Sequence, residues 1–328
     1  MKNMAEWTEG RVPMKDRMRE RRKRMAAAAV LLTVFGGLLA LATVFDLQVS
    51  YLLAAPNLVE GRYFSTNFFC NLVEVAAMAP IWGFATFAAC ILTVYSHHRS
   101  GPGRSLRVFF FGLSVFTGTF FLRDMMKYLL QITDREYIME QTWFNTLMTA
   151  FGLLVTALVL KLAGSRIQAH MEVLLPFALA IVGSCCCFLF VELIKNPVGR
   201  MRFRAMHYIG DYSYYTPWYR ISDAGQMLSG LGLDRDCFKS FPSGHTFSGS
   251  MACLMMLFPD LFRSWRTKRR KTLAYAVPIA YTMAVAFFRV AAGAHFCSDV
   301  LVGGTMGVLA VQFFRWLFLC RLREKFWS

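Results

Sequence analysis

The chain has few acidic residues, and those it has are not clustered. Its 328 residues include 20 Asp and Glu against 36 Lys and Arg, which gives a formal net charge of +16. The acids are scattered, and neither they nor the Cys and His residues show the spacing of a metal site. The nine cysteines also lack the pattern of a disulfide framework. We therefore expect no bound metal, and a protein whose own cations supply the positive charge that a site needs.

Other absences bear on domain organisation. No internal repeat, low-complexity tract or linker divides the sequence. We expect a basic cytoplasmic tail over residues 1–24, one transmembrane domain over 25–320, and a short cytoplasmic tail over 321–328.

Hydrophobic residues make up 56% of the chain and aromatic residues 15%, while charged residues contribute only 17%. This composition is too apolar for an ordinary soluble protein and places the chain in a bilayer.

Long apolar runs predict an all-α, polytopic bundle of about eight transmembrane helices. A helix needs about 20 apolar residues to cross the hydrocarbon core of a membrane. The runs that meet this length lie near residues 25–45, 70–95, 107–126, 143–163, 174–194, 246–262, 272–290 and 296–318.

The distribution of basic residues predicts which side of the membrane each segment faces. With the N-terminus in the cytoplasm, 24 of the 36 Lys and Arg fall in inner segments, as the positive-inside rule requires. The basic runs 17–24 and 266–271 adjoin apolar helices, where they meet anionic lipid headgroups. We therefore expect membrane lipids as partners and exclude a nucleic-acid partner, despite the strong positive charge.

Two groups of residues in the C-terminal half have the spacing of a phosphate-transferring site. His295 and Asp299 are four residues apart, so on a helix the carboxylate accepts the Nδ1 proton and leaves Nε2 as a nucleophile. Arg289 precedes them by six residues and brings a planar, permanently charged guanidinium to the same phosphate. Earlier in the chain, Lys195 and Arg202 add two more cations.

A second motif, Pro242-Ser243-Gly244-His245, is typical of a turn that opens a helix. The backbone N–H groups of this turn and the Ser243 hydroxyl are expected to point at an anion. His245 lies in the first turn of the helix, where it can act as a general acid toward a leaving oxygen. Because phosphoryl transfer depends mainly on positioning and charge neutralisation, these cations and imidazoles suffice for the chemistry.

These motifs resemble those of the type 2 phosphatidic acid phosphatase (PAP2) superfamily, whose pattern is KxxxxxxRP, PSGH and SRxxxxxHxxxD. The resemblance covers residues 174–318, with phenylalanine at 203 in place of proline and at 288 in place of serine. It implies a six-helix family core preceded by two further helices. It also implies a metal-independent phosphatase that needs no cofactor and works through a phosphohistidine.

The resemblance assigns a role to each matched residue. His295 attacks phosphorus, His245 protonates the leaving group, and Asp299 completes the catalytic set. The phosphate oxygens are held by five residues, which are Lys195, Arg202, Ser243, Gly244 and Arg289.

An outer-facing site beside apolar helices predicts an amphiphilic substrate. We expect hydrolysis of a lipid phosphate or diphosphate, such as a polyprenyl diphosphate or a phosphatidate-like lipid. Two alternatives stay open at this point. One is a phosphotransferase of the same superfamily that moves lipid phosphate to another acceptor, and the other is a membrane protein that only binds phospholipid.

Several further residues lack the support of a motif. Arg200, Arg204 and His207 are expected to contact lipid headgroups at most. Glu74 and Glu192 are ionisable groups within or near spans, and we expect each to pair with a neighbouring basic residue. The aromatic segment 203–241, which includes Tyr214, Tyr215 and Trp218, is interpreted as a loop on the headgroup layer. A second hypothesis is that this loop covers the site and selects the headgroup.

Overall fold

The computed structural model describes residues 14–97 and 103–321, and every regular element among them is helical. The all-α fold class is therefore confirmed. Most of the expected N-terminal tail and nearly all of the expected C-terminal tail lie outside the described residues. By internal contacts the chain divides into two compact units, Met1–Phe45 and Asp46–Ser328.

The helices and their bounds are as follows. They are α1 (Met14–Leu53), α2 (Phe68–Ala76), α3 (Ala79–His97), α4 (Gly103–Ile132), α5 (Thr142–Ala169), α6 (Met171–Cys186), α7 (Phe188–Val198), α8 (Phe203–Ile209), α9 (Ala224–Met227), α10 (Gly244–Ser250), α11 (Phe258–Leu261), α12 (Lys268–Ala291) and α13 (Cys297–Arg315).

Seven helical stretches of the described residues are long and apolar enough to cross a membrane. They are Ala28–Asn57, Phe68–His97, Arg104–Ile132, Thr142–Ala169, Met171–Ile209, Lys268–Ala291 and Cys297–Leu319. Each overlaps one of the expected spans, and together they indicate a multi-pass membrane protein.

The remaining expected span, 246–262, is a succession of short helices. It comprises α10, a 3₁₀ segment at Met251–Leu257, and α11. Every residue of α10 is buried, and small residues let its neighbours approach closely. A Cβ atom on Gly249 would lie 3.2 Å from Val285 of α12, and one on Gly304 of α13 would lie 3.1 Å from Thr246. This segment therefore lies inside the bundle, which explains why it combines high apolarity with glycine and serine.

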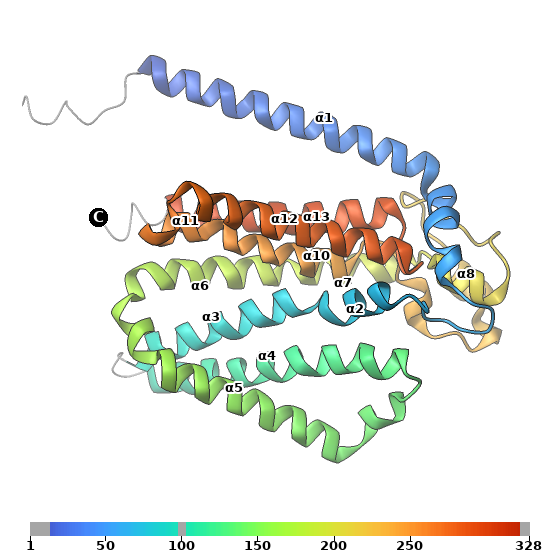
Figure 1. The fold of residues 1–328 in the computed structure, drawn as a ribbon, viewed down its shortest axis with the longest axis horizontal. Coiled ribbons are helices and arrows are strands. Elements are labelled where there is room, and N and C mark those ends of the chain that lie inside the picture. The colour runs from blue at the N-terminus through green and yellow to red at the C-terminus, as the bar shows by residue number, and fades with distance from the viewer. Residues whose placement is uncertain (1–13, 98–102, 322–328) are drawn as a thin grey trace, which may run out of the picture. The chain divides into compact units, whose positions relative to one another are not determined.

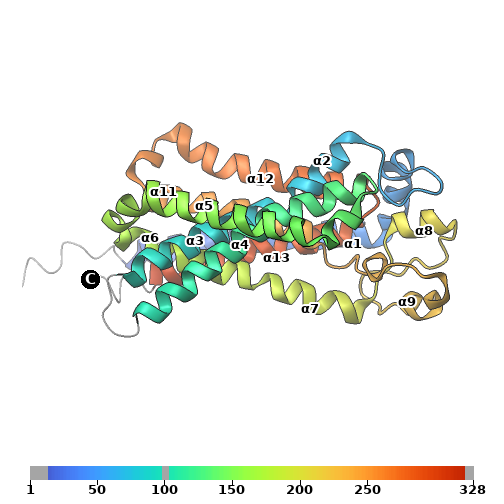
Figure 2. The same ribbon diagram turned by 90° about the horizontal axis from the view of Figure 1, so that it is seen from below.

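The helices of the second unit run back and forth between two ends of the bundle (Figures 1 and 2). One end carries the α4–α5 turn, the long segment 199–243 with α8 and α9, and the α12–α13 turn. The other end carries the α5–α6 turn and α11. Because α7, α10 and the α12–α13 turn all reach the first end, the three motifs are brought to the same place.

A continuous apolar core fixes this arrangement. Phe177 and Ile181 of α6, Phe247 of α10, Leu254 of the 3₁₀ segment and Val311 of α13 are all buried in one cluster. Other large apolar side chains remain exposed on outward helix faces, among them Leu154 and Leu162 of α5 and Met283 of α12. In a membrane-spanning bundle such faces contact lipid.

Candidate active site

The two motif histidines lie beside each other at one end of the bundle. His245 occupies the first turn of α10, and His295 lies in the turn between α12 and α13. Their ring centroids are 6.3 Å apart, and both side chains are buried. Fifty residues of sequence separate the two imidazoles, yet the fold brings their rings together.

The three expected phosphate-binding cations reach the same region. Lys195 belongs to the last turn of α7, Arg202 immediately precedes α8, and Arg289 belongs to the last turn of α12. All three side chains are buried. A buried cation is costly unless it is paired, so the partners of these residues decide what each can still bind.

Each of these cations lies close to one carboxylate. Lys195 Nζ is 2.5 Å from Glu192 Oε1, and Arg202 Nη2 is 2.8 Å from Asp236 Oδ1. The expected pairing of Glu192 with a neighbouring basic residue is therefore confirmed. Asp236 was not predicted, because it lies in a short 3₁₀ segment, Arg235–Phe238, outside the three motifs.

Arg289 retains most of its hydrogen-bonding capacity. Its Nη1 lies 2.8 Å from Glu74 Oε2, so Glu74 pairs with a basic residue as expected. Its Nε and Nη2 have no hydrogen-bond partner among the described residues. The Nε2 atoms of His245 and His295 also lack one. Four buried nitrogens without partners at one place are unusual in a folded protein and are typical of a site for an anion.

The Ser243-Gly244 turn is arranged as the sequence predicts, with one difference. Ser243 caps α10, and its Oγ accepts a 3.3 Å hydrogen bond from the Thr246 N–H and lies 2.9 Å from Thr246 Oγ1. The hydroxyl is thus engaged within its own helix. Gly244 approaches Lys195 closely, since a Cβ atom at Gly244 would lie 2.7 Å from Lys195 Nζ.

This close approach gives a prediction for Gly244→Ala. The added methyl group displaces the end of the flexible Lys195 side chain, not backbone, so the fold should tolerate it. We expect kcat/KM to fall about 10- to 100-fold through the shifted ammonium group, with little change in the thermal unfolding midpoint. Gly164→Ala is the matched control, because no atom lies within 4 Å of a Cβ there. Unchanged kinetics in Gly244→Ala would show that the position of Lys195 is unimportant.

The expected direct hydrogen bond between His295 and Asp299 is not formed. His295 Nδ1 is 3.8 Å from Asp299 Oδ2 but only 2.6 Å from the carbonyl oxygen of Ser240. The reason is that α13 begins at Cys297, so the four-residue helical spacing does not extend back to His295. Asp299 instead accepts hydrogen bonds from the Phe296 N–H at 2.8 Å and from Ser240 Oγ at 2.5 Å.

Arg200 and Arg204 are not headgroup contacts, and this expectation was wrong. Both side chains are buried. Arg204 Nη1 lies 3.1 and 3.2 Å from the two oxygens of Glu74, and Arg200 binds both Asp46 and Asp299. The signal that could have revealed them is the presence of Asp46 and Glu74 in apolar helices, where a carboxylate requires a buried basic partner.

The two departures from the motif pattern have local explanations. Phe203 is the first residue of α8, a position where proline is also favoured, so the helix begins normally without it. Its ring is buried and packs edge-on against Tyr51 at 5.3 Å. Phe288 stacks on Phe69 of α2, with centroids 6.0 Å apart.

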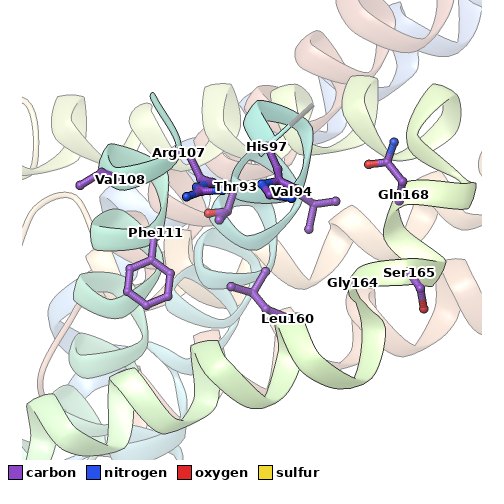
Figure 3. Close-up of a pocket in the computed structure, with 10 residues that line it drawn as sticks. All are labelled: Thr93, Val94, His97, Arg107, Val108, Phe111, Leu160, Gly164, Ser165 and Gln168. Atoms are coloured by element: carbon purple, nitrogen blue, oxygen red, sulfur yellow. Dashed lines mark hydrogen bonds between the residues drawn. The ribbon is translucent and has the colours of Figure 1, made fainter. Parts of the chain in front are cut away.

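A cavity of about 670 Å³ lies between α3, α4 and α5, and Figure 3 shows the residues that line it. It lies near the α3 C-terminus and the α4 N-terminus, at the end of the bundle away from the two motif histidines. Its lining includes His97, Arg107 and Gln168 together with apolar side chains. Nothing from the three motifs contributes to it, so this cavity is separate from the candidate site.

Residues 171–323 match the family model of the PAP2 superfamily. The chain carries a PAP2 superfamily domain. The match begins at α6 and includes every motif residue described above, in agreement with the resemblance seen in the sequence. No curated protein and no solved structure matches the chain.

The match to the PAP2 model over residues 171–323 supports a phosphatase or phosphotransferase function on lipid phosphates. Among residues 14–97 and 103–321, no group of three or more His, Cys, Asp or Glu could hold a metal ion. Asp46, Glu74 and Tyr128 lie before the matched segment, yet they contact PAP2 residues. Glu74 contacts Arg289, and the ring of Tyr128 packs edge-on against His245 at 4.8 Å.

Proposed function

We propose that this protein is a membrane phosphatase that hydrolyses a lipid phosphate or diphosphate through a phosphohistidine on His295, without a metal ion. The observation that carries the proposal is the group of four buried nitrogens without partners on His245, Arg289 and His295. Two of them belong to imidazoles whose rings are 6.3 Å apart. A phosphoryl group between these rings would receive a nucleophile on one side and a proton donor on the other.

The reaction proceeds in two steps that balance. In the first, the lone pair on His295 Nε2 forms an N–P bond as the bond from phosphorus to the lipid oxygen breaks, and His245 donates a proton to that oxygen. In the second, a water molecule attacks phosphorus, His245 takes its proton, and the N–P bond breaks to release phosphate. Lys195, Arg202 and Arg289 hold the phosphoryl oxygens and neutralise their charge.

The location of the site favours a lipid substrate. It lies at one end of a bundle of apolar helices, where the phosphate of a bilayer lipid would also lie. Arg263 of the α11–α12 connection and Lys271 in the first turn of α12 lie toward the opposite end. By the positive-inside rule we infer an outer-facing active site and a cytoplasmic N-terminus.

Purified protein assayed for phosphate release tests this function. The substrate panel comprises phosphatidate, phosphatidylglycerol phosphate, a polyprenyl diphosphate and glucose 6-phosphate, each with chelator present and no added metal. We expect release from at least one lipid, with ¹⁸O from labelled water entering the released phosphate. Activity that is lost in chelator and restored by magnesium would contradict the mechanism. Transfer of phosphate to a lipid or sugar hydroxyl without ¹⁸O uptake would identify a phosphotransferase.

The pH dependence of kcat/KM follows from the charge of the site. Burial lowers the pKa of His295 to about 3, and burial together with the charge of Arg289 lowers the pKa of His245 well below its ordinary value. His295 of the free enzyme is therefore neutral at pH 5 to 8, so the nucleophile is not lost to protonation as pH falls, and the lowered pKa of His245 favours its neutral form too. The proton that His245 donates to the leaving group must then arrive on the substrate and pass to His245 before the transfer.

A phosphate monoester has a second pKa of about 6, so its protonated monoanion disappears above that pH. We expect kcat/KM to be level between about pH 4 and 6 and to fall about tenfold per unit above it. The measurement is kcat/KM from pH 4 to 9 with a soluble short-chain phosphatidate. An acid limb near pH 6.5 and a maximum near pH 8 would show instead that a histidine of the free enzyme must lose its proton.

A further inference from the structure

A buried arginine outside the three motifs connects several parts of the candidate site. The Arg200 side chain is fully buried. Its Nη1 lies 2.5 Å from Asp299 Oδ1 and its Nη2 lies 3.0 Å from Asp46 Oδ2. Its Nε donates a 2.7 Å hydrogen bond to the Thr216 carbonyl, and Nη1 also donates to Ser298 Oγ at 2.9 Å. Every nitrogen of the guanidinium therefore has a partner, unlike those of Arg289.

Asp46 holds the beginning of α13 in place. Its Oδ1 accepts a 2.9 Å hydrogen bond from the Ser298 N–H, and its Oδ2 accepts one from the Ser298 hydroxyl. Ser298 is the second residue of α13, and a carboxylate at a helix N-terminus is stabilised by the unpaired N–H groups there. Asp46 thus fixes the helix end that immediately follows His295.

Ser240 links Arg200 to the nucleophile. Its backbone N–H donates to the Arg200 carbonyl at 3.0 Å, and its hydroxyl donates to Asp299 Oδ2 at 2.5 Å. Its own carbonyl lies 2.6 Å from His295 Nδ1. Because a carbonyl can only accept, this contact requires the proton of the neutral imidazole to be on Nδ1 and leaves the lone pair on Nε2.

We propose that Arg200 and Asp46 are positioning residues, which set the tautomer and the direction of His295 through Asp299 and Ser240. The kinetic part of this inference rests on the proposed phosphatase function. It also extends the site beyond the PAP2 match at residues 171–323, because Asp46 lies 125 residues before that segment begins.

Charge gives a second reason for the arrangement. Asp299 Oδ2 lies 3.8 Å from His295 Nδ1, so one carboxylate of this buried group is next to the nucleophile. The imidazole becomes positive when its Nε2 bonds to phosphorus. A nearby negative charge stabilises that state more than the neutral one, and it acts strongly because water is excluded.

Kinetics of Arg200→Lys and Asp46→Asn test the proposal. Lysine keeps the charge but lacks the guanidinium fork, and asparagine keeps the shape of Asp46 and its ability to cap α13. We expect kcat to fall about 10- to 100-fold in each, since a misdirected nucleophile costs about this much. KM and the inhibition constant of inorganic phosphate should change less than about twofold, because the phosphate-binding cations are intact.

The double variant and a remote control separate positioning from general damage. If Arg200 and Asp46 act through the same contacts to His295, the fold loss in kcat of the double variant should be smaller than the product of the two single losses. Arg315→Lys alters another arginine–carboxylate pair, with Asp260 at 2.7 Å toward the other end of the bundle, and should leave kcat unchanged. Wild-type kcat in both site variants, or an equal loss in Arg315→Lys, would overturn the proposal.

A spectroscopic measurement tests the proposal without an activity assay. It also gives a result if one of the two variants fails to fold. Nitrogen NMR of ¹⁵N-histidine-labelled protein, with the signals of His295 assigned from their loss in His295→Asn, reports which ring nitrogen carries the proton. We expect protonated Nδ1 in the wild type and a shift toward the other tautomer in Asp46→Asn. An unchanged tautomer would overturn the inference. A wild type that hydrolyses no substrate but shows the shift would refute only the proposed function.

Discussion

Replacing His295 by alanine should lower kcat by about 10⁴-fold or more on any substrate that the protein hydrolyses. No other imidazole can substitute, since the ring of His245 lies on the opposite side of the proposed phosphoryl position, 6.3 Å away between centroids. The fold should survive, because the His295 side chain makes one hydrogen bond, to the Ser240 carbonyl. Steady-state rates and thermal unfolding of the two purified proteins give the comparison.

Trapping the phosphorylated protein makes this prediction more specific. Wild type incubated with ³²P-labelled substrate and quenched in alkaline detergent should carry a label that is stable in alkali and lost in acid, and His295→Ala should carry none. His170→Ala is the matched control, since His170 lies in the α5–α6 turn at the other end of the bundle. A label that persists in His295→Ala would move the nucleophile to another residue, and residual activity within tenfold of wild type would refute covalent catalysis by His295.

The sequence predicts the residues that carry the chemistry better than it predicts the contacts among the side chains of the site. Fold class, seven spans and the convergence of His245 with His295 all follow from hydropathy and motif order, because both signals are local in the chain. The succession of short helices at 244–261 did not follow. Its residues are as apolar as those of a transmembrane helix, and only its small residues and its burial by α12 and α13 distinguish it.

The contacts that the sequence did not predict share one physical property, which is long separation along the chain. Arg200 finds Asp46 across 154 positions, and Arg204 finds Glu74 across 130. Spacing rules apply within a helix and cannot report such pairs. The His295–Asp299 expectation failed for the opposite reason, since a helical spacing was applied across the residue at which α13 begins.

The separation of roles among the four buried arginines is the most useful consequence of the structure. Arg200, Arg202 and Arg204 are alternate residues of one short segment, and each binds a carboxylate, namely Asp299 with Asp46, Asp236 and Glu74. Arg202 also donates hydrogen bonds from Nε to the Asp236 carbonyl and from Nη1 to the Ala294 carbonyl. Of these four, Arg289 alone has two guanidinium nitrogens, Nε and Nη2, with no partner among the described residues, so it should contribute most to phosphate binding.

Arg289→Lys should therefore lower kcat/KM by about 10²- to 10³-fold, the usual cost of removing a donor that stabilises transition-state charge. Lysine retains the charge toward Glu74, so folding should be little affected, but a single ammonium group cannot replace a planar fork on two phosphoryl oxygens. The inhibition constant of inorganic phosphate should rise as well, which distinguishes this variant from Arg200→Lys. Arg315→Lys again serves as the control. If Arg289→Lys binds phosphate as tightly as wild type and loses less than tenfold in kcat/KM, the unpartnered nitrogens of Arg289 do not hold the substrate, and the clamp must be assigned to Lys195 and Arg202.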